Sequence, residues 1–521
     1  MSFQSAIRQQ ACSKNLFAAL ILFSVLFIYW PAADSQFIWD DNAHIVTNQN
    51  MNSVQGLGDI WLQKTEPGEF HHYPITASSH WVEYQLWSLK PFFYRLVNLC
   101  LHLINIGLFA YLLRCLKIPG LLFAILLFAT HPLFTESVSW ISGRNNLLCT
   151  AFVLLSWLMF MRKNIGFYMI SLGFFALAML AKPIACILPI MIVGSHLIAP
   201  HRSQIKALFV RLLPMLAIGF VTGVYFLQQE SALVGTLSNK SLIEQFLIMG
   251  RIFCFHIGKF LYPINLSFLY PKWPDVGSIW SLIAACIVVV MTFIIFRVRS
   301  MHGRGIALGI FWYSINIIPV SGLLPLNYFR FAYVSDHFAY LPGMGLCIAA
   351  GCLLHGVRGH IKPYLFYPLF LIMLGVMLMT AQLRTQILQY PESAFRDTLK
   401  KNSNSWMAHS ELATTLADQG KTDEAKLHLF RTIQIEAGYN KAYIKLGNIY
   451  FSEGDDENAL SWYLKALMRD PKNIEARFNI STLHLKVGKT VKARQVLESI
   501  LLIDSAHEPT LKRLRGLNLQ K

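Results

Sequence analysis

Long, largely apolar runs recur along this chain, and their length limits what the chain can fold into. The runs at 15–33, 92–113 and 363–382 hold 19, 22 and 20 residues, and a helix of about 20 apolar residues crosses the hydrocarbon core of a bilayer. Of the 521 residues, 55% are hydrophobic and 14% are charged. This composition leaves too little polar surface to cover a soluble protein of this size. The sequence therefore predicts an all-α, polytopic membrane domain.

The apolar runs predict about eleven membrane spans, and the basic residues between them predict their direction. The expected spans lie near 15–33, 92–113, 118–134, 145–161, 164–181, 184–199, 208–227, 278–296, 305–324, 337–354 and 363–382. Lysine and arginine gather in alternate connections, which the positive-inside rule assigns to the cytoplasm. The first run lacks a small-x-small cleavage site, so we interpret it as an uncleaved anchor with a cytoplasmic N-terminus. The loop 34–91, the segment 228–277 and the C-terminal domain are then expected to face outward.

The net charge and the cysteines exclude several classes of protein. The charge of +17 suggests nucleic acid, but the basic residues lie at the ends of apolar runs, so topology explains them and no nucleic-acid partner is expected. Eight of the nine cysteines lie in or beside expected spans, which indicates neither a disulfide framework nor a zinc site. GxxxxGKS, HExxH and GxSxG are absent, so nucleotide hydrolysis, zinc proteolysis and serine-hydrolase chemistry have no support.

A 34-residue period follows the last expected span. Gly420, Gly454 and Gly488 recur at this spacing, and so do Ala425, Ala459 and Ala493. The pattern matches the tetratricopeptide repeat, a pair of helices that stacks into an α-solenoid. We expect a membrane domain at 1–385, a linker helix at 386–405 and a repeat domain at 406–521. Its three repeats lie near 406–439, 440–473 and 474–507, and residues 508–519 form a capping helix.

The predicted repeat domain has two possible roles. Solenoids present concave grooves that bind peptides, which favours capture of an acceptor or partner protein. The alternative is an appendage that stabilises or oligomerises the protein. Asn448 and Asn479 are candidate groove residues.

An acidic pair, Asp40 and Asp41, stands where the first span emerges on the outward side. A carboxylate at this position can take a proton from a substrate held at the membrane surface. Neighbouring side chains of an extended segment point to opposite sides, so only one of the pair is expected to reach the substrate. The structural alternative is that one of them caps a helix that begins near Asn42.

A second outward patch lies between two expected spans and contains His131, Glu136, Arg144 and Asn145. Ionisable residues this close to lipid are candidates for function. Arg144 offers paired donors that fit a phosphate, and Glu136 is expected to pair with it or to orient an acceptor. The alternative is an ion pair between Glu136 and Arg144 that only closes the loop.

Two further outward positions carry cations. Lys182 lies at the end of a span before Pro183, where it either neutralises a phosphate or extends to the lipid headgroups. Arg330, Asp336 and His337 form a third group among tyrosines, which either binds sugar or belongs to an aromatic belt.

These segments together resemble the transmembrane and tetratricopeptide-repeat-containing family, within the C-type glycosyltransferase superfamily that includes protein O-mannosyltransferases. The resemblance covers nearly the whole chain. Its motifs are WDDNAHIVTN, YPITASSHWVEYQLW, HPLFTESVSWISGRNNLL, the AKP of Lys182, GKFLYPINLSFLYP and SDHFAYLP, followed by the repeats. The chain departs from the family where His337 replaces an expected arginine, and at Gly143, Asn145 and Asn146, where bacterial relatives often carry charge.

The resemblance implies an inverting transfer of a sugar from a polyprenyl-phosphate carrier to a protein hydroxyl. It implies catalytic roles for Asp40, Asp41 and Glu136, contacts to the donor phosphate from Arg144, Lys182 and Arg330, and substrate contacts from His80, His131, Asp336 and His337. No cofactor or metal ligand is assigned, although a divalent ion remains compatible. The expected partners are the lipid-linked donor, membrane lipids and an acceptor protein held by the repeats.

The expected location is a bacterial inner membrane with the repeats in the periplasm, and the departures from the family leave the transferred sugar open. Two other functions fit the same features. One is an oligosaccharyltransferase resembling O-antigen ligase, and the other is a non-catalytic membrane scaffold whose repeats recruit an envelope assembly.

Overall fold

The computed structural model describes residues 3–62, 73–198, 205–234, 241–274, 301–322 and 327–519, with a few residues between 279 and 287. Every regular element in these residues is helical, and no strand occurs among them. The all-α prediction is therefore confirmed. The chain divides into two compact units, Met1–Ala394 and Phe395–Lys521, and the boundary falls inside the expected linker 386–405.

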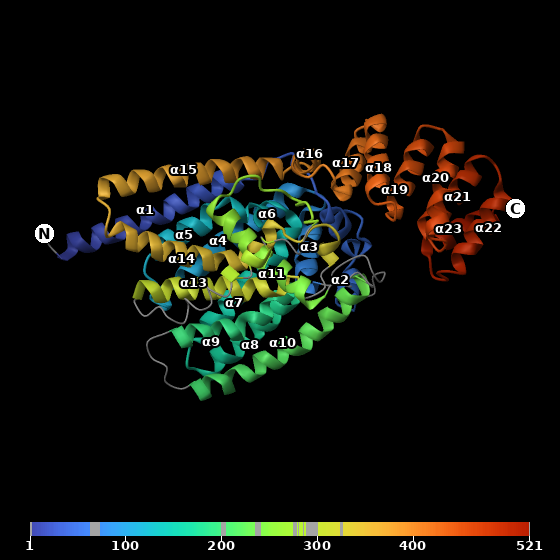
Figure 1. Cartoon of the computed structure of the whole chain (residues 1–521). Helices are drawn as coiled ribbons and strands as arrows, with labels where there is room; N and C mark the ends of the chain where they lie inside the picture. The colour runs from blue at the N-terminus through green and yellow to red at the C-terminus, as the bar shows by residue number, and fades with distance from the viewer. Residues whose placement is uncertain are drawn as a thin grey trace. The chain divides into compact units, whose positions relative to one another are not determined.

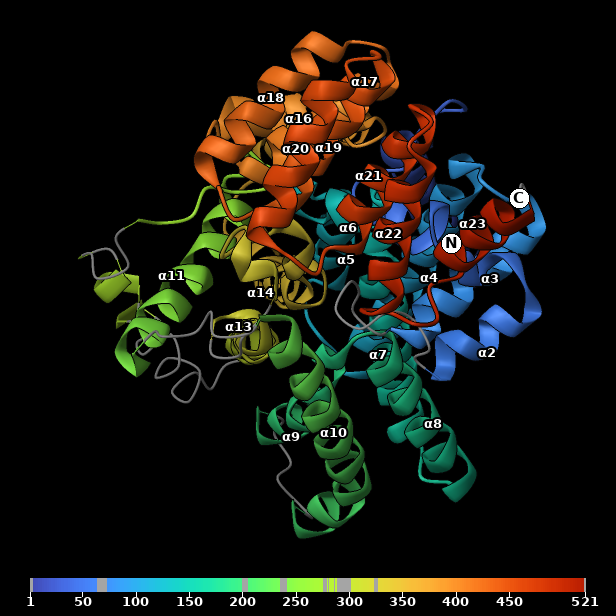
Figure 2. The ribbon, with the colours of Figure 1, turned by 90° about the vertical axis from the view of Figure 1, so that its right-hand side faces the viewer.

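The first unit is a bundle of helices of unequal length, with α8, α9 and α10 together along one edge (Figures 1 and 2). Its α-helices are α1 (Phe3–Tyr29), α2 (Val54–Leu62), α3 (Pro74–Trp87), α4 (Pro91–Cys115), α5 (Leu121–Thr130), α6 (Thr135–Ser139), α7 (Arg144–Phe160), α8 (Ile165–Ala181), α9 (Leu188–Ile198), α10 (Ile205–Val234), α11 (Leu242–Leu261), α13 (Met301–Ile317), α14 (Tyr340–Arg358) and α15 (Pro363–Ile387). Short helical turns connect them: η1 (Asn42–Val46), η2 (Gln49–Asn52), η3 (Pro132–Phe134), η4 (Ile141–Gly143), η5 (Pro183–Ile187), η6 (Ile318–Val320), η7 (Asn327–Arg330) and η8 (Asp336–Ala339).

Fewer helices than expected are suited to crossing a membrane. Four in the described residues are long and apolar enough, and a bent pair makes a fifth if it forms one span. The four are Pro91–Cys115, Lys206–Gln228, Asp336–Arg358 and Pro363–Ile387, and the pair is Leu121–Thr130 with Pro132–Ser139. Three shorter apolar helices are Asn15–Tyr29, Ile165–Ala181 and Pro183–Ile198. The prediction of about eleven spans is therefore wrong for the described part of the chain, and most of the expected span 278–296 lies outside it.

Two helix breaks limit the length of the apolar helices, one inside the expected span 118–134 and one between the expected spans 164–181 and 184–199. His131 ends α5 in an extended conformation, and the chain bends by 52° before the next helical segment. Lys182 is extended in the same way after α8. A proline follows each of them, and proline disfavours the helical conformation in the residue before it. Average hydropathy does not register the break at His131, because the residues on both sides of it remain apolar.

Helix α14 belongs to the most deeply buried of the four candidate spans: 83% of the apolar 18-residue stretch within Asp336–Arg358 is buried. It packs closely against α13 because small residues meet there: a Cβ on Gly309 would lie 2.5 Å from the carbonyl oxygen of Gly345. The turn η8 leads directly into α14. Asp336 and His337 are therefore held inside the bundle.

Helices α1 and α15 lie side by side (Figure 1), and the segments that follow them are tied together. The Gln36 N–H donates to the carbonyl of Gln389 at 2.9 Å, and the Tyr390 hydroxyl donates to Asp34 at 2.7 Å. The residues after the first apolar helix and those after α15 therefore emerge at the same end of the unit. The expected topology requires this common end, and the side of a membrane that it faces stays a prediction.

The second unit contains helix pairs in the predicted register. After α16 (Pro391–Lys401) come α17 (Trp406–Asp418) with α18 (Thr422–Ile435), α19 (Asn440–Ser452) with α20 (Asp456–Arg469), α21 (Ile474–Lys486) with α22 (Thr490–Leu501), and α23 (Glu508–Leu519). Gly420, Gly454 and Gly488 have φ of +77°, +82° and +73°, the left-handed conformation in which helices commonly end. The 34-residue period is thus one helix pair and its turns, and the predicted repeat fold is confirmed.

Candidate active site

A cavity of about 280 Å³ in the first unit collects side chains from distant parts of the sequence. Its polar lining includes Asp40, His44, Ser142, Asn145, Lys182 and His337. Apolar lining comes from Ile184, Gly223, Phe226, Leu227, Pro319 and Val320. The cavity therefore combines a charged, polar wall with an apolar wall.

The two members of the acidic pair have different environments. Asp40 lines the cavity, whereas Asp41 is fully buried and is not among the lining residues. Asp41 accepts hydrogen bonds from the backbone N–H of Ile38 at 2.9 Å and from the N–H and hydroxyl of Ser142 at 2.8 and 2.5 Å. Burial raises the pKa of the Asp41 carboxyl, and the hydrogen bonds from Ser142 and Ile38 oppose that rise. Asp41 makes no helix-capping hydrogen bond at the start of η1, so it ties the first loop to η4 instead.

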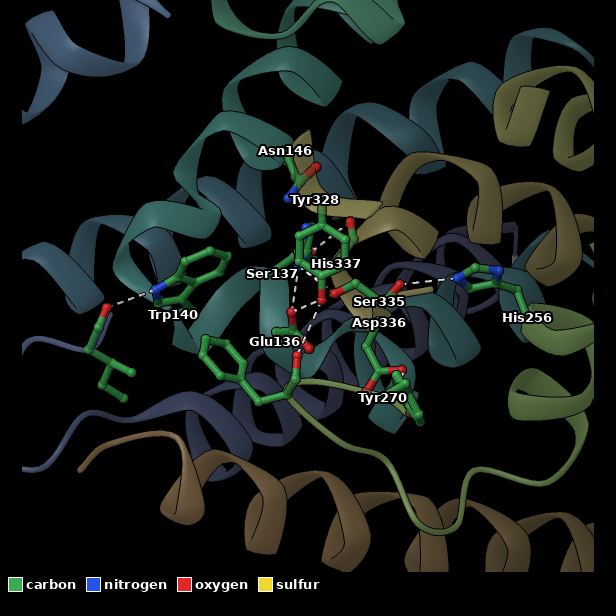
Figure 3. Close-up of polar contacts among 12 residues, drawn as sticks. Glu136, Ser137, Trp140, Asn146, His256, Tyr270, Tyr328, Ser335, Asp336 and His337 are labelled. Atoms are coloured by element: carbon green, nitrogen blue, oxygen red, sulfur yellow. Dashed lines mark hydrogen bonds and ion pairs between the residues drawn. The ribbon is translucent and has the colours of Figure 1, made fainter. Parts of the chain in front are cut away.

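Glu136 meets His337 rather than Arg144. Glu136 Oε1 lies 2.5 Å from His337 Nδ1, and the Ser335 hydroxyl donates to the same oxygen at 2.9 Å (Figure 3). The Ser335 oxygen is also 2.6 Å from His337 Nδ1. His337 lines the cavity, whereas Glu136 is buried and is not among the lining residues. Glu136 is therefore placed to orient His337.

Buried contacts hold the segment that carries His337. The Tyr270 hydroxyl donates to Asp336 Oδ1 at 2.8 Å, and His256 Nε2 contacts the Ser335 carbonyl at 3.0 Å (Figure 3). Asp336 is 1% exposed and does not line the cavity. The structure thus places Asp336 behind the wall, whereas the sequence predicted that it contacts substrate.

Arg144 pairs with Glu83, an acid that the sequence left without a role. Its Nη1 donates to Glu83 at 2.6 Å, its Nε to Asn98 at 2.5 Å, and its Nη2 to the Tyr94 carbonyl at 2.8 Å. The expected pair with Glu136 is therefore wrong. Because its guanidinium is committed to α3 and α4 and does not line the cavity, Arg144 fits a structural role better than the predicted contact to a donor phosphate.

Lys182 lines the cavity, as expected for a cation that meets a phosphate. Its Nζ donates to Asn146 Oδ1 at 2.7 Å and lies 5.7 Å from the centre of the Phe338 ring. Its side chain is buried rather than extended toward the surface, since the residue is 9% exposed. This position disagrees with the alternative in which Lys182 extends to the lipid headgroups.

Three other candidates lie outside the cavity lining. Arg330 is exposed at the end of η7. His80 is buried on α3. His131 accepts from the Leu133 N–H through Nδ1, and its Nε2 contacts the Phe260 carbonyl at 2.8 Å. Both of its ring nitrogens are thus engaged, and His131 caps η3.

The aromatic residues of the cavity were not among the predicted site residues. Trp39 and Trp140 line it and are stacked, with ring centres 5.9 Å apart and planes 13° apart. Trp39 has φ +52°, a conformation that is rare for a bulky residue and tends to occur at functional sites. Only the position of Trp39 beside the acidic pair hinted at this role. Within the described residues, no group of three or more potential metal ligands occurs.

Comparisons with known proteins match part of the repeat region and, separately, most of the length of the chain. A model of the TPR repeat matches residues 447–488. The chain is 26% identical over 465 residues to Protein O-mannosyl-transferase F38B6.6 of Caenorhabditis elegans, covering 83% of this chain and 65% of that protein. It is 25% identical to Protein O-mannosyl-transferase TMTC4 of Mus musculus, over 77% of this chain and 64% of the relative. It is 21% identical to Protein O-mannosyl-transferase TMTC3 of Homo sapiens, over 91% of this chain and 54% of that protein.

This chain spans between 54% and 65% of the length of these relatives. The solved structure of the MamA protein covers 30% of this chain at 20% identity with a TM-score of 0.21, which is too low to indicate a shared fold. The curated matches extend over most of the chain, as the sequence motifs predicted. The chain is thus similar to the transmembrane and tetratricopeptide-repeat-containing proteins along most of its length.

Proposed function

We propose that this protein is a membrane glycosyltransferase that moves a sugar from a polyprenyl-phosphate donor to a protein hydroxyl. One observation carries the proposal: Asp40, Lys182 and His337, from three distant segments, line one cavity that also has an apolar wall. A lipid-linked sugar phosphate needs both kinds of surface, because its phosphate and sugar are polar and its lipid is not. The names of the relatives make mannose the first sugar to test.

Asp40 is the proposed general base. The acceptor oxygen forms a bond to the anomeric carbon while the bond from that carbon to the phosphate oxygen breaks, and the hydroxyl proton passes to the Asp40 carboxylate. Attack opposite the leaving phosphate inverts the anomeric configuration. Asp41 is unsuited to the same role, because Ile38 and Ser142 occupy its oxygens.

Lys182 is the proposed partner of the donor phosphate. A cation at this point stabilises the negative charge that develops on the leaving group. Phe226 and Leu227 of α10 supply apolar surface in the same cavity, which fits the first isoprene units of the donor. His337 is placed to contact the sugar or the phosphate at the polar wall.

The proposed setting is a C-type glycosyltransferase domain in a membrane, with its acceptor captured by the repeats. The common end of α1 and α15 supports a shared face for the loop after the first apolar helix and the segment that leads to the repeats. We propose that this face is non-cytosolic. A bacterial inner membrane remains the expected location, and the relatives named above are animal proteins.

Transfer by the purified full-length chain in lipid nanodiscs tests this proposal. The assay supplies radiolabelled polyprenyl-phosphate mannose, then glucose or other hexoses, with unfolded acceptor proteins rich in serine and threonine. We expect transfer by the wild type, a loss of about 100-fold or more in Asp40→Asn, and wild-type transfer in Asp59→Asn. Asp59 is a matched control because it lies in α2 of the same outward segment and does not line the cavity. Equal transfer by Asp40→Asn and the wild type excludes Asp40 as the base.

A further inference from the structure

Lys182 borders a second, much smaller cavity on the side of α7. This cavity has a volume of about 10 Å³, and its lining includes Asn146, Cys149, Thr150, Lys182 and Phe338. Lys182 and Phe338 line the larger cavity as well. The Lys182 side chain therefore borders both the proposed donor site and a smaller space, which the apolar residues Ile184, Val320, Leu341 and Pro342 also line.

Two polar side-chain atoms of residues that line the small cavity are unpaired within the described part of the chain. Asn146 Nδ2 and Thr150 Oγ1 are buried and have no hydrogen-bond partner among the described residues. The two residues are 7% and 0% exposed, and they are four positions apart on α7, so they share one face of the helix. Cys149 is different, because its thiol contacts the Lys182 carbonyl at 3.6 Å. Buried polar atoms are nearly always paired, so these two indicate a ligand.

The Lys182 ammonium has donors to spare. A lysine ammonium carries three N–H groups, and one of them donates to Asn146 Oδ1 at 2.7 Å. That bond fixes the orientation of the Asn146 amide, because the acceptor oxygen must face the ammonium. Asn146 Nδ2 is then the donor that needs an acceptor.

The size and chemistry of the space select its occupant. A water fits a cavity of roughly 10–15 Å³ on this measure and needs two to four polar partners. The volume of about 10 Å³ admits a single water and excludes a phosphate or a sugar. Asn146 Nδ2 can donate to that water, Thr150 Oγ1 can accept from it, and an N–H of Lys182 can complete its contacts.

We propose that one buried water joins Lys182, Asn146 and Thr150, and that it holds the ammonium in the orientation that meets the donor phosphate. Asn146 and Thr150 are then positioning residues for Lys182. This role rests on the proposed function, because it gives Lys182 the donor phosphate as its ligand. The proposal of the water does not rest on that function, because it is argued only from the small cavity and the unpaired polar atoms beside it.

Substitutions at Thr150 test the positioning role. Thr150→Val keeps the shape and removes the hydroxyl, and we expect kcat/KM for the polyprenyl-phosphate donor to fall about 10-fold. Thr150→Ser keeps the hydroxyl and should stay within about 2-fold of the wild type. Ser156→Ala is the matched control, since it removes another buried hydroxyl of α7 that bonds to Ser171 and not to Lys182. Similar losses in the valine, serine and alanine variants contradict the proposal.

A double-mutant cycle separates positioning from packing. In a Lys182→Met background, Thr150→Val should cause no further loss of kcat/KM, because its effect acts through the ammonium. An equal loss in both backgrounds overturns the proposal. Wild-type transfer by Lys182→Met instead refutes the donor role of Lys182, and thus the positioning role, but not the water.

A cryo-EM map of the full-length protein in nanodiscs tests the water without an activity assay. At a resolution that shows other buried waters, the wild type should show density between Lys182, Asn146 and Thr150. The Thr150→Val map should lack it. Absence of that density from the wild-type map overturns the proposal whatever the activity of the variants.

Discussion

Glu136 Oε1 lies 2.5 Å from His337 Nδ1, although 201 residues separate the two side chains in the sequence. With Glu136 ionised, its oxygen can only accept this hydrogen bond, so Nδ1 carries the proton and Nε2 is left as an acceptor. Of these two residues, His337 lines the cavity and Glu136 does not. Glu136 therefore sets the tautomer and orientation of His337, and the catalytic contact predicted for Glu136 becomes an indirect one.

Substitutions of Glu136 and His337 should have strongly non-additive effects on kcat/KM. We expect Glu136→Gln to lower kcat/KM about 10-fold and His337→Gln to lower it further, because the imidazole loses first its orientation and then its contact. The double variant should be no worse than His337→Gln, since Glu136 acts through His337. Transfer kinetics of the four proteins measure this coupling. Additive losses contradict it, and Ser139→Ala serves as the neighbouring control, because the Ser139 hydroxyl bonds to Thr385 and not to this pair.

Substitution of Arg144 should lower the stability of the protein more than it weakens donor binding. Its ion pair with Glu83 is buried, and removal of one partner from a buried pair costs about 3–5 kcal/mol. We expect Arg144→Met and Glu83→Gln each to lower the midpoint of thermal unfolding in nanodiscs. The fraction that remains folded should keep a donor KM near that of the wild type. A normal unfolding midpoint with a greatly raised donor KM supports the original phosphate role instead.

Asp41 should be a stability residue in contrast to its neighbour. Asp41→Asn places an amide where Ile38 and Ser142 donate, and one mismatched buried hydrogen bond costs about 1–3 kcal/mol. We expect a lower unfolding midpoint and a folded fraction that still transfers sugar. Ser142→Ala removes one of the same bonds and should lower the midpoint less. An Asp41→Asn protein with normal stability and no transfer assigns the base to Asp41 rather than Asp40.

The fold was predictable where the sequence repeats or is uniformly apolar. Gly420, Gly454 and Gly488 specify the helix pairs through local backbone conformation, so one period gives the repeat fold. The prediction of spans failed at His131, where a helix break before a proline lies inside the expected span 118–134; the break at Lys182 falls between two expected spans. Hydropathy averaged over a stretch of about 20 residues carries no information on such a break.

Part of the site was predictable from the position of polar residues along the sequence. Asp40, Lys182 and His337 stand at the ends of apolar segments, and the structure does bring them to one cavity. The partner of Arg144 was not predictable, because Glu83 is 61 positions away and several acids were equally available in the sequence. The left-handed backbone of Trp39 likewise depends on tertiary packing against Trp140.

The repeat domain should lose stability in mild acid. His409 Nδ1 and His428 Nδ1 lie 2.8 Å apart, so the two rings share at most one proton between these atoms. Burial lowers the pKa of both residues; at His428 the nearby Glu424 opposes this lowering and Arg396 adds to it. Below a pH of about 6.5 the unfolded histidines bind protons that the folded pair resists, so stability falls as the pH falls.

Thermal unfolding of a fragment that begins at Phe395 measures this effect between pH 8 and pH 5. The midpoint should be constant at the upper end and should drop below the ordinary histidine pKa. His409→Gln should flatten the pH dependence, whereas His507→Gln, at another histidine of the domain, should leave it unchanged. A midpoint that rises in acid contradicts the assignment.

Donor binding and sugar transfer, measured on the same nanodisc samples, separate the roles of Asp40 and Lys182. Asp40→Asn should bind the polyprenyl-phosphate sugar as the wild type does and transfer it at least about 100-fold more slowly, whereas Lys182→Met should bind the donor more weakly. Wild-type transfer by Asp40→Asn, or unchanged donor binding and transfer in Lys182→Met, contradicts the assignment of this cavity as the place where sugar is transferred.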